Sequence, residues 1–155
     1  MSAPLPFVGQ KRMFAKHFIE IIKQYPEGTV FVDLFGGSGL LSHITKHFHP
    51  ESTVIYNDFD GYRERIANVG RTNALLDRIR PIASQFPRHK PITGEARERI
   101  FGLLEAEERE NGYLDFITMS SSLMFSMKYK MSIPEMRRET LYNNVRKAGY
   151  PSCPD

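Results

Sequence analysis

The amino-acid sequence predicts an α/β fold, with a parallel sheet in its first third and mostly helices after it. Residues 29–34 (TVFVDL) are apolar and β-branched with almost no alternation, which is typical of a strand buried on both faces. A glycine turn (FGGSG), a helix (LLSHITKHF) that ends at His49 and Pro50, and a second strand (STVIYND) follow directly. This order makes a βαβ unit, so the strands should pair in parallel and form part of a Rossmann-like sheet.

Helical patterns lie on both sides of this unit. Residues 10–25 have apolar side chains at helical spacing, and Pro26 ends the pattern. A second helix is predicted over residues 61–80, with a weak point at Gly70. A loop should follow, with Pro81, Pro87 and Pro91.

The last third is predicted to be helical as well. Residues 94–110 have the pattern of a strongly charged helix. Residues 113–127 fit either a helix or a strand, and the spacing of their apolar side chains favours a helix. Ser132 and Glu135 form a capping box that should open a helix over residues 133–147.

The length of the chain, 155 residues, suits one domain with a core and is too short for two ordinary ones. We divide it by composition into residues 1–60, the βαβ part, and residues 61–155, a basic and helical segment. A doubly wound sheet normally has about five to seven strands, and the sequence supplies only two secure ones. The chain therefore resembles the first part of a larger domain.

Composition excludes several classes of protein. Eleven Phe and seven Tyr exclude intrinsic disorder, and a single cysteine, Cys153, excludes a disulfide scaffold. No apolar run approaches the ~18 residues of a membrane helix, and the N-terminus lacks the apolar core of a signal peptide. His43, His47 and His49 lack further ligands for a metal. We therefore expect a cytoplasmic protein without metal or membrane partners.

Positive charge is concentrated after residue 60. Residues 61–90 carry seven Lys and Arg against two acidic residues, whereas residues 1–60 are nearly neutral. A second basic cluster comprises Lys128, Lys130, Arg137, Arg138, Arg146 and Lys147. This distribution suggests a small-ligand site joined to a surface that meets polyanions, although solvated helix faces would give the same pattern.

The candidate ligand site is the segment DLFGGSG and the acid after the next strand. Gly37 and Gly39 allow a sharp turn and a close approach of a ligand to the backbone. Asp33 could hold a cationic amino group, and Asp58 could accept ribose hydroxyls of a nucleoside cofactor. The structural alternative for Asp58 is a helix cap, for which Asp60 is the better candidate. These residues alone do not separate NAD from S-adenosylmethionine.

The N-terminal segment decides between the two cofactors. The segment PFVGQK, an amphipathic helix, DLFGGSG and YNDFD occur in this order over about the first sixty residues. In order and spacing they resemble the DNA adenine-N6 methyltransferase family (Dam-like methylases). The resemblance implies a class I methyltransferase fold and S-adenosylmethionine as cofactor, with an (aromatic)-x-G-x-K segment that folds back over it.

The resemblance also implies roles for single residues. Phe7 and Lys11 would contact S-adenosylmethionine, Lys11 through the methionine carboxylate. Asp33, Phe35 and Gly37, followed by Gly39, would form the methionine side of the pocket, and Asp58 would bind the ribose. The family uses an Asp/Asn-Pro-Pro-Tyr/Phe motif for catalysis, and the sequence contains no Pro-Pro pair. We therefore predict no catalytic residue and no methyl transfer by these 155 residues alone.

Double-stranded DNA is the partner that the resemblance implies, and residues 61–155 fall where linking and DNA-recognition elements belong. The candidate DNA-binding residues are Arg71, Arg78, Lys128, Lys130, Arg137 and Arg138. The predicted function is therefore the S-adenosylmethionine-binding N-terminal part of an adenine-specific DNA methyltransferase. The alternatives are a non-catalytic DNA-binding remnant and a methyltransferase that acts on RNA or a small molecule.

Overall fold

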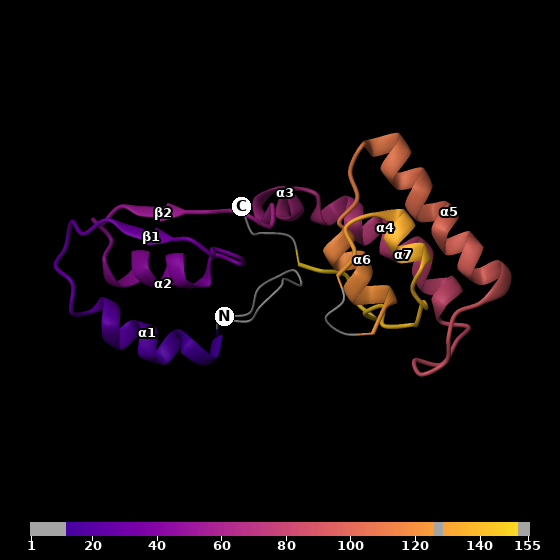
Figure 1. The fold of residues 1–155 in the computed structure, drawn as a ribbon, viewed down its shortest axis with the longest axis horizontal. Helices are drawn as coiled ribbons and strands as arrows, with labels where there is room; N and C mark the ends of the chain where they lie inside the picture. Colours follow the sequence, from indigo (N-terminus) through magenta and orange to yellow (C-terminus); the bar gives the residue numbers. More distant parts are fainter. Residues whose placement is uncertain (1–11, 126–128, 152–155) are drawn as a thin grey trace. The chain divides into compact units, whose positions relative to one another are not determined.

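The computed structural model describes residues 12–125 and 129–151, and Figure 1 shows their elements. The chain divides into two compact units between Glu64 and Arg65, inside helix α3 (Tyr62–Ala67). The first unit holds a small parallel sheet, and the second is helical. The predicted α/β class with a parallel sheet and mostly helices is therefore confirmed.

The first unit is the predicted βαβ arrangement with a helix before it. A short 3-10 turn, Arg12–Phe14, leads into α1 (Ala15–Ile22). Strand β1 (Phe31–Asp33), helix α2 (Leu40–Phe48) and strand β2 (Val54–Tyr56) follow. The strands pair in parallel, with Phe31 opposite Val54 and Asp33 opposite Tyr56. In Figure 1, α2 lies between the two strands and α1, which agrees with its packing against both.

The prediction that the first strand is buried on both faces is wrong. Val32 is 54% exposed, and Ile55, its partner in the register, is 51% exposed. Phe31 points to the other side, where its ring packs against the rings of Tyr25 and His49. The helices of this unit cover that second side, so the strand alternates between a covered and an exposed face.

His49 joins α1 to the end of α2. Its ring is buried, and its Nε2 atom lies 2.7 Å from the carbonyl oxygen of Ile22 at the end of α1. Its Nδ1 atom lies 3.4 Å from a carboxylate oxygen of Glu27. His49 therefore has a structural place in the fold, as a polar link between two helices.

The second unit is built on four helices after the end of α3. They are α4 (Val69–Ala83), α5 (Gly94–Asn111), α6 (Phe116–Leu123) and α7 (Ile133–Arg137). Helix α4 packs on α5, and α5 packs on α7 (Figure 1). The core comprises the buried side chains of Leu75, Leu76, Ile79, Ile100, Phe101, Leu104, Met119, Leu123, Met136 and Leu141. Over the two described stretches of the chain, no helix is long and apolar enough to cross a membrane.

Two helix boundaries differ from the prediction. The break in the helix after residue 60 falls at Asn68 and not at Gly70, and α4 continues through Pro81 instead of ending there. Burial of Ile79, Ile82 and Ala83 outweighs the hydrogen bond that a proline loses in the last turn of a helix. The ambiguous segment 113–127 contains a helix and no strand in its described part.

The helix that Ser132 opens is shorter than predicted. The Ser132 hydroxyl accepts a hydrogen bond from the N–H of Glu135 at 3.4 Å, as a capping box requires, but α7 ends at Arg137. The following residues run in extended form because their backbone bonds go elsewhere. Leu141 pairs with Ile92 in an antiparallel bridge, and Tyr142 N–H donates to the carbonyl of Leu123 at 2.7 Å.

The segment after α7 is bonded to Asn73 of α4 at a later point, Tyr150. The Asn73 side-chain amide donates to the carbonyl of Tyr150 at 2.8 Å and accepts from the N–H of the same residue at 2.7 Å. An added Cβ on Gly149 would lie 3.0 Å from the Asn73 side chain. The segment up to Tyr150 is therefore fastened to α4 and packs closely against it.

A buried ion pair joins α3 to α6 within the second unit. Arg65 Nε lies 2.9 Å from Asp115 Oδ1, and both side chains are almost fully buried. The Asp115 carboxylate also accepts from the N–H and the hydroxyl of Thr118, at 3.0 and 2.7 Å. These bonds make Asp115 the cap of α6, and its carboxylate is held by the fold and closed to solvent.

Candidate functional site

The carboxyl ends of β1 and β2 lie side by side and open onto the glycine turn. Asp33 ends β1 opposite Tyr56, which ends β2. The N–H of Asn57 donates to the carbonyl of Asp33 at 3.0 Å, and the Asn57 side chain donates to the carbonyl of Leu34 at 3.0 Å. The ends of parallel strands in α/β proteins are where ligands bind, so this edge is the candidate site.

Tyr56 fixes the glycine turn at this edge. Its hydroxyl donates to the carbonyl of Gly37 at 2.6 Å and lies 3.3 Å from Asp58 Oδ1. Its ring packs closely against Gly36, so that a Cβ on Gly36 would overlap the ring and lie 2.8 Å from the carbonyl oxygen of Asn57. Burial, with the Asp58 carboxylate beside it, raises the pKa of the Tyr56 phenol above its ordinary value.

Asp33 is oriented by the helix that follows the turn. The Ser42 hydroxyl, in the first turn of α2, donates to Asp33 Oδ2 at 2.8 Å. Gly39 is the N-cap of this helix and has a φ of 71°, in the left-handed region that favours glycine. The predicted residues Asp33, Gly37 and Gly39 are thus brought to one edge of the sheet, and Ser42 joins them.

Asp58 is a helix cap as well as a member of this edge. Its carboxylate accepts from the N–H of Tyr62 at 2.6 Å and from the N–H of Arg63 at 2.9 Å. The prediction that Asp60 caps this helix is therefore wrong, because the carboxylate two residues earlier does so. A carboxylate offers about four acceptor positions, and the two N–H groups use two of them. Acceptor capacity on Asp58 is therefore left for a ligand.

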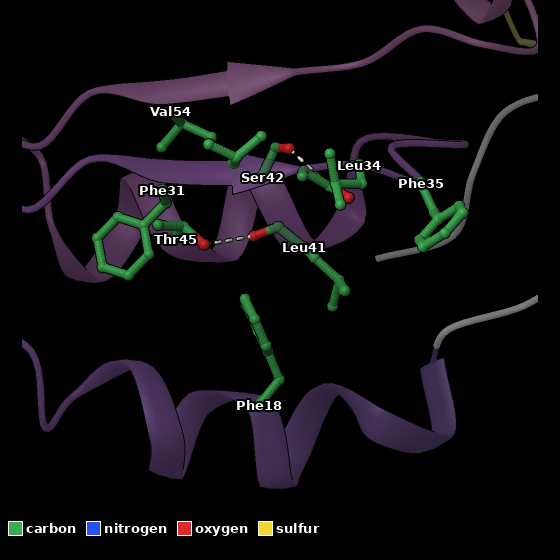
Figure 2. A pocket seen from close by; sticks show the side chains of 10 residues that line it. Phe18, Phe31, Leu34, Phe35, Leu41, Ser42, Thr45 and Val54 are labelled. Atoms are coloured by element: carbon green, nitrogen blue, oxygen red, sulfur yellow. Dashed lines mark hydrogen bonds between the residues drawn. The ribbon is translucent and has the colours of Figure 1, made fainter.

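A pocket of about 330 Å³ lies beside this edge, within the first unit. Figure 2 shows Phe18 of α1 pointing toward Leu41 and Phe31, with Leu34 and Phe35 at the other end of the pocket. Asp33 and Ser42 supply its polar side, and most of the other lining side chains are apolar. Of the predicted cofactor residues, Asp33 and Phe35 line this pocket, whereas Gly37, Gly39 and Asp58 lie outside its lining.

The predicted N-terminal contacts, Phe7 and Lys11, lie outside the described residues. Among the predicted DNA-binding residues the same holds for Lys128. Lys130 forms an ion pair with Glu139 at 2.8 Å.

The guanidinium of Arg137 forms ion pairs with two glutamates and stacks on an aromatic ring. It bonds Glu105 at 2.9 Å and Glu98 at 2.8 Å, and it stacks over the ring of Phe101 with 4.4 Å to the centroid. The hydrogen bond from Arg137 lowers the pKa of the Glu98 carboxyl. Much of the charge of Arg137 is therefore balanced within the second unit.

Arg71, Arg78 and Arg138 are exposed, and no ion pair of theirs occurs in residues 12–125 or 129–151. Arg71 and Arg78 share one face of α4, two helical turns apart. Their role in DNA binding stays a prediction.

Sequence reasoning missed Tyr56 and Ser42. Tyr56 stands in the YND segment as one more apolar strand residue, and only the fold brings it to Gly36, twenty positions earlier. Ser42 replaces the third glycine of a GxGxxG pattern, which was a signal that its side chain has a role.

This geometry defines a class: α/β proteins with a glycine-rich turn between two parallel strands and carboxylates at the strand ends. The chain belongs to the D12 class N6 adenine-specific DNA methyltransferase family, whose sequence model matches residues 7–145. It is also 39% identical over 157 residues to a Haemophilus influenzae protein named "Putative methyltransferase". That alignment covers 98% of this chain and 52% of the relative, so the chain spans about half of the relative's length. No solved structure is significantly similar to it.

Proposed function

We propose that this chain is the S-adenosylmethionine-binding part of an adenine-specific N6 DNA methyltransferase, with a Rossmann-like class I fold. The observation that carries the proposal is the meeting of Asp33, the glycine turn and Asp58 at the carboxyl ends of two parallel strands. Membership of the D12 family supports both the cofactor and the adenine base as methyl acceptor.

The residues at this edge fit the cofactor chemically. S-adenosylmethionine carries an ammonium, a sulfonium and a ribose diol, and Asp33 and Asp58 offer carboxylate acceptors for such groups. Gly37 and Gly39 have no side chain and adopt positive φ angles, so a ligand can approach the backbone of the turn closely there. Phe59 is 87% exposed, which offers a ring for contact with a flat heterocycle.

Each residue would then have a defined task. Asp33, oriented by Ser42, would hold the amino group, and Asp58 would accept the ribose hydroxyls with the acceptor capacity that the two N–H groups of α3 leave. Lys11 and Phe7 would close over the cofactor, as the family resemblance implies. When bound, S-adenosylmethionine supplies a methyl group on an already activated sulfonium, so positioning would supply most of the rate.

The methyl acceptor would be an adenine flipped out of duplex DNA. We assign its binding to no residue of this chain, because the sequence has no Pro-Pro-aromatic segment. Asp115 is not a substitute, since its carboxylate caps α6 and pairs with Arg65. We expect no methyl transfer to unmethylated DNA in an assay with tritiated cofactor, and turnover that Asp58→Ala abolishes would overturn this assignment.

Calorimetry with S-adenosylmethionine tests the cofactor site. Loss of a charged hydrogen bond costs about 1.5–3 kcal/mol, so Asp58→Ala should weaken binding roughly ten- to hundredfold. Asp58→Asn keeps an acceptor for the N–H groups of α3 and should weaken binding without unfolding the cap. Asp60→Ala, two residues away, is the matched control and should bind as the wild type does. Equal affinities for all four proteins would refute the site.

A further inference from the structure

The second unit contains an open, basic groove, whereas the candidate cofactor site belongs to the first unit. Its volume is about 700 Å³. One wall consists of Arg80, Ser84 and Arg88, at the end of α4 and just after it. The other wall is the extended segment 143–148, which lies beside this end of α4.

The two walls are tied together by hydrogen bonds, so the groove has a fixed form. Arg80 Nε donates to the carbonyl of Arg146 at 2.9 Å, while the same guanidinium pairs with Asp77. The Asn143 amide donates to the carbonyl of Phe86 at 3.2 Å. The backbone of the segment is therefore anchored at several points along α4 and its continuation.

The groove combines cations from both basic clusters of the sequence. Arg80 and Arg88 come from the first cluster, and Arg146 and Lys147 from the second. No carboxylate lines it, and Asp77 balances only Arg80, so about three positive charges stay uncompensated there. The guanidinium of Arg146 lies 4.8 Å from the centre of the Tyr150 ring, which restricts its position.

Two of these four basic side chains are accessible to a ligand. Arg88 and Lys147 are exposed, and neither forms an ion pair within the part of the chain that the structure describes. Neither was among the candidate DNA-binding residues, and the sequence separates the two by 59 positions. The fold places them on facing walls of one groove.

We propose that this groove binds the phosphodiester backbone of a nucleic acid. Arginine forks match phosphate oxygens, and a groove of this volume is far larger than a single phosphate needs. Several cations along its length suit a polymer with regularly spaced charges. The choice of duplex DNA as the nucleic acid rests on the proposed function, whereas the groove itself rests on its geometry and charge.

The test compares two double charge reversals in the full chain. Arg88→Glu with Lys147→Glu changes the groove, and Arg99→Glu with Arg109→Glu changes two exposed arginines of α5 by the same total charge. Binding to fluorescent duplex DNA, to duplex RNA and to heparin is measured between about 50 and 200 mM salt. Calorimetry with S-adenosylmethionine on each variant reports on the first unit separately.

The groove variant should bind duplex DNA at least tenfold more weakly than the wild type, and its salt slope should fall by about 2, one for each phosphate contact. The α5 variant should stay within about threefold of the wild type, because only long-range charge is altered. Equal losses of DNA affinity in both variants would overturn the proposal for the groove, since the net charge of the protein would then explain the binding. Absence of nucleic-acid binding by the wild type would overturn it as well.

Failure of the proposed function has a different signature. If the wild type binds duplex RNA more tightly than duplex DNA and the groove variant loses that binding, the groove stands and the DNA substrate fails. Alternatively, the wild type binds both duplex DNA and S-adenosylmethionine strongly, and the groove variant still binds DNA. The proposed function then stands, and the assignment of the groove as the nucleic-acid site is refuted. Heparin binding that survives in the groove variant with DNA binding lost supports a phosphodiester-specific contact.

Discussion

Gly36→Ala should displace the ring that holds the candidate cofactor edge together. A Cβ at this position would lie 2.5 Å from Tyr56 Cδ2 and closer still to Cε2, whereas ordinary contact begins at 3.4 Å, so the ring must withdraw by more than about 0.9 Å. The Tyr56 hydroxyl, now 2.6 Å from the carbonyl of Gly37, would then move out of hydrogen-bond range. The Asn57 carbonyl, 2.8 Å from the new Cβ, is backbone and cannot rotate away.

The free energy of unfolding should fall by about 1.5–4.5 kcal/mol. Overpacking contributes about 1–3 kcal/mol of this loss, and the hydrogen bond contributes about 0.5–1.5 kcal/mol. Urea unfolding followed by hydrogen exchange of peptides from residues 31–36 and 54–58 reports on the first unit separately from the helical one. Gly102→Ala is the control, because nothing lies within 4 Å of a Cβ there and Gly102 is inside α5. It should stabilise the protein by up to about 1 kcal/mol.

A double-mutant cycle shows whether the ring is the cause. In a Tyr56→Ala background the added methyl group no longer meets the ring, so Gly36→Ala should cost at least about 1 kcal/mol less than in the wild type. An equal cost in both backgrounds would refute the reasoning, because the loss would then come from the backbone of the turn alone.

Three further outcomes are expected. Asp115→Ala should lower the free energy of unfolding by about 3–5 kcal/mol in urea titrations, since it leaves Arg65 buried without this partner and removes the cap of α6. Ser42→Ala should weaken S-adenosylmethionine binding about three- to tenfold in calorimetry, because Asp33 loses its orienting donor. Folding raises the pKa of the Tyr56 phenol, so its stabilising effect is fully present below about pH 10 and is lost only as pH rises through the folded value. The difference in phenolate absorbance between the wild type and Tyr56→Phe should therefore rise only above the pH range in which an ordinary tyrosine ionises.

The βαβ unit could be predicted because local sequence patterns specify it. The glycine turn, the helix that ends at His49 and the two apolar strands are each specified by neighbouring residues, and the structure has them in the predicted order. The strand edges were less well predicted: β1 is three residues long, and Val32 is exposed because helices cover only the other side. Burial on two faces depends on what packs there, which a strand's own composition does not specify.

Features that depend on distant residues escaped prediction. The residues after α7 have helical propensity, yet they run extended because Ile92 and Leu123 supply backbone partners from elsewhere in the chain. The role of Asp58 as the cap of α3 was assigned to Asp60, since both precede the helix and only the turn geometry separates them. Roles for Phe7 and Lys11 stay predictions.

The amide of Asn73 contacts both polar backbone groups of Tyr150, and this has a consequence for the length of the chain there. The Asn73 side chain donates to the carbonyl of Tyr150 and accepts from its N–H, so it fixes which residue of the segment lies beside α4. A shift of the segment by one residue would break both hydrogen bonds. The carbonyl of Arg146 is bonded to α4 as well, so three residues must span the interval between two fixed points. Insertions or deletions between Arg146 and Tyr150 should therefore be rejected, whereas Lys147 and Ala148, which are exposed, can be exchanged freely as far as folding is concerned.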